Sequence, residues 1–208
     1  MDFNSLLLFV VACLTINLIP GPDVIYIVSN TMKGKMTSGL KAALGLGVGY
    51  FAHTLAACLG LSAIILNSAL AFSVVKWLGA AYLMYLGVQA LLSMWRGGNQ
   101  IVLNESDTEN QNVFVHGVIV SVLNPKVALF FLSFLPQFIN ASSGSVSMQL
   151  LMLGLIFSGL ATLCNVIYAA AGSWLFNKAD SKRYSRALEG ISGVLLLGLA
   201  SKVAISDR

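Results

Sequence analysis

The sequence predicts an all-α integral membrane protein that crosses the bilayer about six times. Of its 208 residues, 57% are hydrophobic and only 10% are charged, and the mean hydropathy is +0.84. Soluble domains carry about 25% charged residues, so this chain has too little charge to cover a surface exposed to water. A helix needs about 20 residues to cross a bilayer. The apolar runs are continuous rather than alternating, which argues against a membrane β-barrel.

Six apolar segments are predicted as helices, in the order 4–29, 40–66, 74–95, 114–139, 147–174 and 187–204. The first has no basic region before it and is too long for a cleavable signal peptide, so we expect it to remain as a helix. Trp77 and Trp95 bracket the third, as interfacial aromatic residues do. Polar or charged linkers are expected at 30–41, 67–73, 96–112, 140–145 and 176–186.

The distribution of lysine and arginine predicts the orientation. With six crossings, the first, third and fifth linkers share one side of the membrane. They contain eight basic residues, namely Lys33, Lys35, Lys41, Arg96, Lys178, Lys182, Arg183 and Arg186. The other side has Lys76, Lys202 and Arg208. Because basic loops favour the cytoplasm, we expect both termini outside it. The net charge of +4 follows from the same loops and does not indicate nucleic-acid binding.

The two halves of the chain, 1–112 and 113–208, are weakly similar to each other. The matches are Pro22-Asp23-Val24 with Pro125-Lys126-Val127, His53 and Gly60 with Asn165 and Gly172, and Gly79 and Gly87 with Gly190 and Gly198. Three helices in each half would invert the second copy relative to the first. Many secondary transporters have such inverted repeats, with binding sites near the membrane midplane at broken helices. We therefore expect a 3+3 inverted repeat, with helices one and four broken at Pro20-Gly21-Pro22 and Asn124-Pro125.

Asp23 and Lys126 are the predicted centre of a binding site. Each lies beside a predicted break. A charged side chain at the middle of the bilayer costs about 2.5–3.5 kcal/mol. We therefore expect the two to face each other from opposite halves of the chain. Pro20 and Pro22 free upstream carbonyls, which can hold an ammonium group, and Gly21 allows a ligand to approach closely. The alternative is an ion pair that only fixes helix packing.

Other polar side chains in the apolar segments extend the predicted site. The full substrate-binding set is Asn17, Pro20, Gly21, Pro22, Asp23, His53, Asn124, Pro125, Lys126, Asn165 and Tyr168, and Thr54 and Thr162 could line the same cavity. Each polar member has a simpler alternative role in hydrogen bonds between helices. Asp23 is the preferred proton carrier, because burial raises the pKa of a carboxylate, although Lys126 opposes that shift. His53 is the alternative, since imidazole titrates near neutral pH.

Small residues in the apolar segments are predicted to serve packing. Gly45, Gly47 and Gly49 form a ridge that favours close helix contact. Three cysteines lie in apolar runs without CxxC spacing, and we expect them to be buried packing residues. They are Cys13, Cys58 and Cys164.

Three motifs together carry a family resemblance. They are Pro20-Gly21-Pro22-Asp23 after Asn17, His53 followed by Gly60, and Leu123-Asn124-Pro125-Lys126 before an apolar run. The chain resembles the LysE/RhtB family of bacterial amino-acid exporters over nearly its whole length. The resemblance implies an exporter in the inner membrane, driven by the proton motive force. Its similarity to the RhtB-like branch implies neutral substrates such as homoserine, threonine or leucine.

An ion or metal exporter of a related superfamily fold is the alternative. Such a protein needs sulfur, histidine or several carboxylates at one site, whereas we expect one histidine and one carboxylate in the membrane. An intramembrane enzyme would need a nucleophile–base or metal constellation, and neither HExxH nor a phosphate loop occurs. We expect no enzymatic activity, cofactor or metal. The expected partners are an amino acid, protons and lipid; the sequence is also compatible with a homo-oligomer.

Overall fold

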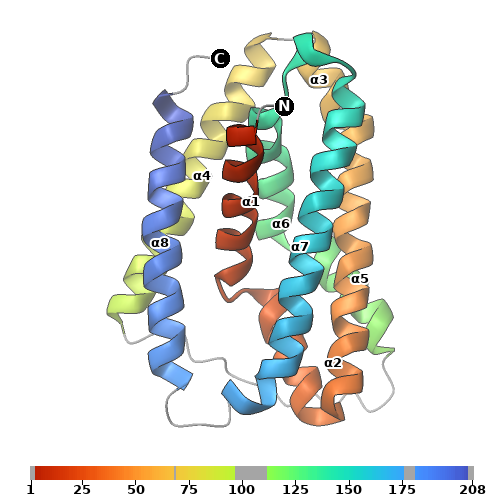
Figure 1. Cartoon of the computed structure of the whole chain (residues 1–208), viewed down its shortest axis with the longest axis vertical. Helices are drawn as coiled ribbons and strands as arrows, with labels where there is room; N and C mark the ends of the chain where they lie inside the picture. Colours follow the sequence, from red (N-terminus) through yellow and green to blue (C-terminus); the bar gives the residue numbers. More distant parts are fainter. Residues whose placement is uncertain (1–2, 68, 97–111, 176–180, 206–208) are drawn as a thin grey trace.

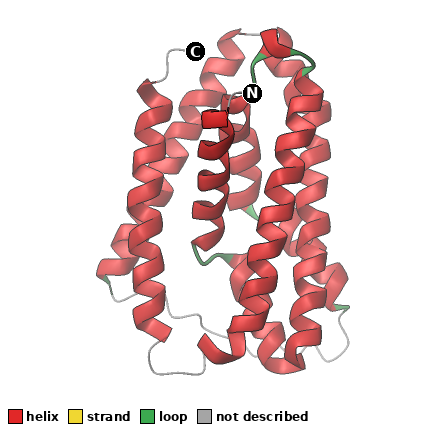
Figure 2. Ribbon diagram, viewed as in Figure 1, coloured by secondary structure: helices red, strands yellow, loops and turns green. Residues whose placement is uncertain are grey.

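The computed structural model describes residues 3–67, 69–96, 112–175 and 181–205, and within these ranges the regular structure is entirely helical (Figures 1 and 2). Two of the described helices, Pro22–Leu61 and Val146–Ala171, are long and apolar enough to cross a membrane. A third span results if the bent pair Val113–Val122 and Pro125–Phe138 counts as one. Shorter apolar helices cover Asn4–Leu18, Ala80–Trp95 and Glu189–Ser201. The all-α class is therefore confirmed for these residues, and six crossings remain a prediction.

The first predicted break is present. Helix α1 (Phe3–Leu18) ends before Pro20, and helix α2 (Pro22–Ala56) starts at the next proline. Gly21 caps α2 with an extended backbone (φ −134°, ψ −170°) and offers no side-chain hydrogen bond. Proline is favoured at the first position of a helix because its fixed φ suits the helix and its missing N–H is not needed there.

The predicted linker at 30–41 is wrong over most of its length. Only Gly34 and Lys35 leave the helical conformation, and Lys35 has a positive φ of 61°. There α2 divides into two segments, and Figure 1 shows the chain reversing direction at the lower end of the bundle. Polar residues misled the prediction because a helix satisfies its own backbone groups and can continue into a polar environment. We call the two segments α2a (22–33) and α2b (36–56).

The chain then continues through further helical segments. A π-helical turn η1 (Ala57–Leu61) and α3 (Ser62–Asn67) follow α2, and α4 covers Ala69–Trp95. The predicted linker 67–73 is therefore helical from Ala69 onward. The polar linker at 96–112 lies largely outside the described residues.

The second predicted break is also present. Helix α5 (Val113–Val122) ends just before Asn124, and α6 (Pro125–Leu129) begins at the proline. A π-helical turn η2 (Phe130–Phe134) and a 3₁₀ turn η3 (Leu135–Phe138) continue α6. The two arms are bent by 44°.

The last third of the chain has two long helices. A 3₁₀ turn η4 (Ala141–Ser143) precedes α7 (Val146–Leu175), and α8 covers Ser181–Ile205. Residues 176–180 lie outside the described residues. The remainder of the predicted basic linker, 181–186, is helical, so that expectation is also wrong.

Helices from the two halves of the chain pack against each other in pairs. α2 packs on α5 and α7, α4 packs on α8, and α1 lies between these groups (Figure 1). Glycines permit the close contacts: a methyl group at Gly45 would overlap the carbonyl of Phe114, and one at Gly49 would overlap Ser121. Gly87 and Gly193 approach reciprocally, and a Cβ on either would lie within 3.1 Å of the other's carbonyl oxygen. The predicted role of the glycine ridge in helix contact is confirmed for Gly45 and Gly49.

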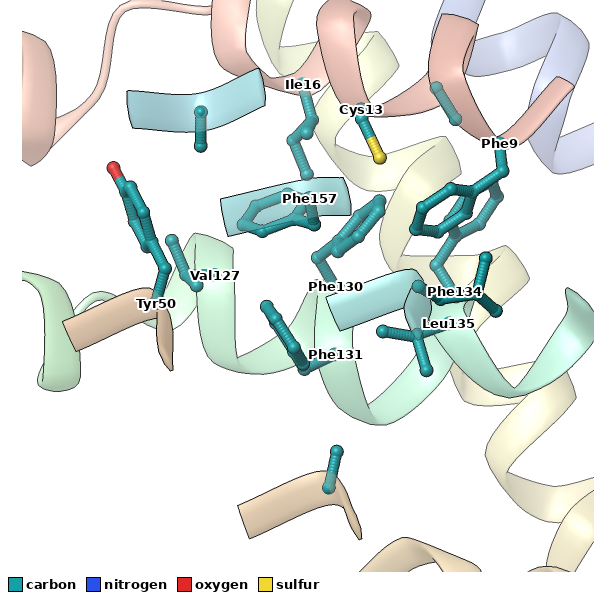
Figure 3. Close-up of a cluster of buried hydrophobic side chains, with 14 of the residues drawn as sticks. Phe9, Cys13, Ile16, Tyr50, Val127, Phe130, Phe131, Phe134, Leu135 and Phe157 are labelled. Carbon is teal, nitrogen blue, oxygen red and sulfur yellow. The ribbon is translucent and has the colours of Figure 1, made fainter. Parts of the chain in front are cut away.

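An aromatic cluster fixes α1 against the second half of the chain. Phe9 of α1 contacts Phe130, with ring centroids 6.2 Å apart, and Phe130 stacks on Phe157 of α7 at 4.7 Å (Figure 3). Phe9 also contacts Phe138, with ring centroids 5.1 Å apart. Phe9, Phe130 and Phe157 are at most 1% exposed. The cluster therefore anchors the arm that precedes the first break to the arm that follows the second.

Candidate functional site

The two helix breaks meet at a buried ion pair. The Nζ atom of Lys126, in the first turn of α6, lies 3.1 and 3.0 Å from Oδ1 and Oδ2 of Asp23, in the first turn of α2. Asp23 is 1% exposed and Lys126 is 7% exposed. The expected juxtaposition across the two halves is therefore present. Each charge is stabilised by the other, because an isolated buried charge would be costly.

The first break supplies backbone acceptors to this pair. Lys126 Nζ also donates a hydrogen bond to the carbonyl of Ile19, at 3.2 Å. The carbonyl of Leu18 accepts a hydrogen bond from the hydroxyl of Tyr168, at 3.1 Å. In a continuous helix the carbonyl of Leu18 would accept from the N–H four residues later, but that residue is Pro22, which has no N–H. The hydroxyl of Tyr168 from α7 donates to this carbonyl instead.

Gly21 lies directly against the ion pair. A Cβ atom at this position would be 2.8 Å from Asp23 Oδ1 and 3.0 Å from Lys126 Nζ. Other residue types can also adopt the extended backbone conformation of Gly21. Glycine is therefore required here because there is no space for a side chain, and not because of its backbone conformation. This agrees with the expectation that Gly21 permits a close approach.

The second break is organised by Asn124. Its side-chain Oδ1 accepts a hydrogen bond from the backbone N–H of Lys126 at 3.0 Å. The backbone N–H of Asn124 donates to the carbonyl of Ser121 at 3.1 Å. Pro125 occupies the first position of α6. Asn124 is 1% exposed, so this small network fixes the start of α6 and hence the position of Lys126.

His53 lies at the second break rather than on the ion pair. Its Nε2 is 3.1 Å from the carbonyl oxygen of Ser121, and its ring stacks on Phe131 with centroids 5.7 Å apart. A carbonyl can only accept, so Nε2 must carry a hydrogen and donate. His53 thus contacts both arms of the broken helix: the edge of its ring bonds to Ser121 of α5, and the face of its ring stacks on Phe131 of η2.

The remaining predicted residues have separate partners. Asn165 Nδ2 donates to the hydroxyl of Tyr50 at 2.9 Å. Asn17 bonds back to the carbonyl of Cys13, and Thr54 bonds back to the carbonyl of Tyr50. These bonds stay within one helix, but Thr54 Oγ1 also lies 3.4 Å from Ser158 Oγ of α7, a contact between helices of the kind that the simpler alternative gives. Thr162 packs opposite Gly47.

Sequence reasoning missed Tyr50 and Glu189. Tyr50 is fully buried, and the signal for it was a hydroxyl one turn before His53 in an apolar helix. Glu189 of α8 is 1% exposed, so a second carboxylate besides Asp23 is buried among the described helices. Its position near the basic start of α8 made it resemble a solvated charge at a helix end. Among the described residues, no group of three or more His, Cys, Asp or Glu side chains could hold a metal ion.

Comparison with known proteins identifies the family. The sequence model of the family described as LysE type translocator matches residues 14–207. The chain belongs to the LysE type translocator family. The resemblance of its motifs to this family is confirmed, and the family is one of transporters rather than enzymes.

Several relatives cover almost the whole chain. The "Uncharacterized membrane protein YrhP" of Bacillus subtilis (strain 168) is 30% identical over 98% of this chain and 100% of its own length. A protein of Enterobacter sp. (strain 638) named "Leucine efflux protein" is 26% identical, covering 94% of this chain and 93% of its own. A protein of the same name from Salmonella choleraesuis (strain SC-B67) is 25% identical over 94% and 92%. No solved structure matches the chain. These relatives and the apolar helices identify this LysE-family chain as a multi-pass membrane protein and, at the family level, an amino-acid exporter.

Proposed function

We propose that this LysE-family protein exports neutral amino acids across the inner membrane and binds them at the Asp23–Lys126 pair. The observation that carries the proposal is a buried pair of opposite charges at the junction of two helix breaks. An amino acid is a zwitterion with the same two charges. Its ammonium group can replace Lys126 beside Asp23 and the Ile19 carbonyl, while its carboxylate can replace Asp23 beside Lys126. Every buried charge then keeps an opposite partner, which a low-dielectric site requires.

The preference for neutral side chains rests on the groups around the breaks. Apart from the ion pair itself, the hydrogen-bonding side chains described there are an amide, a hydroxyl and an imidazole, from Asn124, Tyr168 and His53. Asn165 and Tyr50 form a further uncharged polar pair on α7 and α2b. A lysine or arginine substrate would bring a second cation without an evident partner. The names of the two leucine efflux relatives favour the same class, which includes homoserine, threonine and leucine.

The proposed architecture has six crossings in a 3+3 inverted repeat, with repeats 1–112 and 113–208. α1 with α2a would form the first crossing, and α5 with α6, η2 and η3 the fourth. The pairwise packing of α2 with α7 and of α4 with α8 supports this arrangement, because equivalent helices would then meet across the pseudo-symmetry axis. Rocking one repeat against the other would open the site to either side.

The orientation is proposed from charge. The start of α1 and the end of α8 lie at one end of the bundle, and the turn at Lys35 lies at the opposite end (Figure 1). The start of α8 lies at that opposite end too (Figure 1), and Arg186, in its second turn, donates from Nε to the carbonyl of Met94. The basic end would face the cytoplasm, which places both termini outside it.

Transport is proposed to be proton antiport. The geometry favours His53 over Asp23 as the proton carrier, the reverse of the order expected from sequence, because Asp23 is already engaged by Lys126 or by substrate. Replacing His53 with Gln keeps a donor for the Ser121 carbonyl but removes the imidazole ring and its second nitrogen, Nδ1. This variant should retain substrate exchange in counterflow assays and lose efflux driven by a proton gradient. Asp23→Asn is the parallel variant; normal proton-driven efflux in both would exclude both residues as carriers.

A competition assay on reconstituted protein tests the substrate site. The competitors are neutral amino acids, lysine, arginine, and the amide and decarboxylated analogues of the best substrate. Analogues that lack either charge should compete poorly, because one member of the ion pair would then be left unpaired. If the amide competes as well as its parent, the proposed carboxylate contact is wrong. If lysine or arginine is the best substrate, the neutral preference is wrong.

A further inference from the structure

Asn124 has a buried hydrogen-bond donor that the fold does not use. The side chain is 1% exposed, and Nδ2 has no hydrogen-bond partner among the described residues. The orientation of the amide is determined by its other end, since Oδ1 accepts the backbone N–H of Lys126 and therefore must be the oxygen. Most buried side-chain polar atoms are hydrogen-bonded, and an unpaired one destabilises the fold. A donor kept in this state calls for a partner that this conformation lacks.

The position of this donor indicates the chemistry of that partner. Asn124 precedes Lys126 by two residues and caps helix α6, in whose first turn Lys126 lies. The Nζ atom of Lys126 is the cation of the proposed substrate site. A cation and an amide N–H on one short stretch of chain provide two donors, and a carboxylate has two acceptor oxygens.

We propose that Asn124 Nδ2 recognises the substrate carboxylate together with Lys126 Nζ, an assignment that rests on the proposed function. Asn124 then has two separate roles. Its oxygen holds the start of α6 in place, and its nitrogen selects a carboxylate over an amide. In this conformation Asp23 pairs with Lys126 Nζ, and Asn124 Nδ2 is unpaired. When the substrate displaces Asp23, one oxygen of the substrate carboxylate accepts from Lys126 Nζ and the other accepts from Asn124 Nδ2.

The test separates these two roles by substitution. Asn124→Ser keeps a capping oxygen without adding charge, and Asn124→Asp keeps the shape and the capping oxygen; both remove the amide donor. Asn112→Asp is the matched control. Asn112 caps α5 in the same way, accepting from Phe114 and Val115, but it is exposed and distant from the ion pair in sequence.

The readout is the concentration for half-maximal competition in counterflow, measured for the best amino acid and for its amide. Loss of a hydrogen bond to a charged group should weaken competition by the amino acid about 10- to 100-fold in Asn124→Ser. Competition by the amide should change much less, so that the preference for acid over amide collapses. Asn124→Asp should be at least as impaired for the amino acid, since it places a second anion beside the carboxylate. Asn112→Asp should match wild type for both competitors.

Two failures are distinguishable. If wild-type protein moves no amino acid, the proposed function falls and this assignment falls with it. If wild type transports but Asn124→Ser keeps its affinity and its acid-over-amide preference, only the assignment is overturned. A parallel loss for acid and amide in Asn124→Ser also overturns it, because that pattern indicates a purely structural role. Elution of each variant as a single species in detergent checks that it is folded.

Discussion

The two helix breaks use the same residue, proline, yet present opposite chemistry. At the first break, the carbonyls of Leu18 and Ile19 turn outward and accept hydrogen bonds from Tyr168 and Lys126. At the second, the free backbone N–H of Lys126 at the start of α6 finds its acceptor in the side-chain oxygen of Asn124. The first break is therefore rich in acceptors, whereas the second presents a cation and an amide donor.

The difference comes from the residues beside each proline. Gly21 gives α2 no side-chain cap, so the first break leaves its backbone open and places Asp23 next to it. Asn124 closes the second break and positions Lys126. One break suits an ammonium group and the other a carboxylate. Under the proposed function, the site for a zwitterion would be formed by two similar interruptions that differ in their capping residue.

The largest expected effect comes from breaking the pair that joins the two breaks. Lys126→Met should leave Asp23 buried and unpaired, costing about 3–5 kcal/mol of stability, and should abolish export. The double variant Asp23→Asn with Lys126→Met should recover most of that stability without recovering export, because neither charge remains to bind substrate. Thermal unfolding in detergent and efflux from reconstituted vesicles measure the two properties separately. Equal stability of the single and double variants would show that an unpaired Asp23 carries no penalty at this position.

The breaks themselves could be predicted from sequence because proline acts locally. Pro22 and Pro125 each start a helix where expected, and the charge after each was visible in the sequence. The end of a helix in a polar segment was less predictable. In place of the expected linker at 30–41, only Gly34 and Lys35 leave the helical conformation. Polar side chains alone do not end a helix, because the helix breaks only where the backbone dihedral angles change.

The partners across the breaks could not be predicted, because they depend on tertiary contacts. Nothing local indicates that the Ile19 carbonyl meets Lys126, or that Tyr50 meets Asn165, 115 residues away. His53 was recognised as unusual, yet its position on the Ser121 carbonyl depends on the packing of α2b against α5. Glu189 was overlooked because burial of a charge near a helix end is a property of the neighbouring helices.

A smaller effect is expected from crowding the first break. Gly21→Ala adds a methyl group 2.8 Å from Asp23 Oδ1 and 3.0 Å from Lys126 Nζ, so the pair must shift. Overpacking of this kind costs about 1–3 kcal/mol, and we expect it mainly as weaker substrate competition. Gly159→Ala in α7 is the control, since nothing lies within 4 Å of its added methyl. If both variants compete like wild type, close approach at Gly21 is not required for binding.

The smallest effect should come from removing one hydroxyl. Tyr168→Phe deletes the donor to the Leu18 carbonyl, which has no helical donor because Pro22 stands four residues later. The expected loss of stability is about 1 kcal/mol. Tyr26→Phe is a matched control, because Tyr26 also donates to a backbone carbonyl of another helix, that of Val113, at 2.7 Å. Val113 starts α5, so its carbonyl can still accept the N–H four residues later in the helix. The comparison of thermal unfolding midpoints therefore isolates the carbonyl that the proline releases: Tyr168→Phe should lower the midpoint more than Tyr26→Phe does. An equal or smaller decrease would mean that the first break does not depend on an external donor, and its description as an acceptor-rich site would have to be given up.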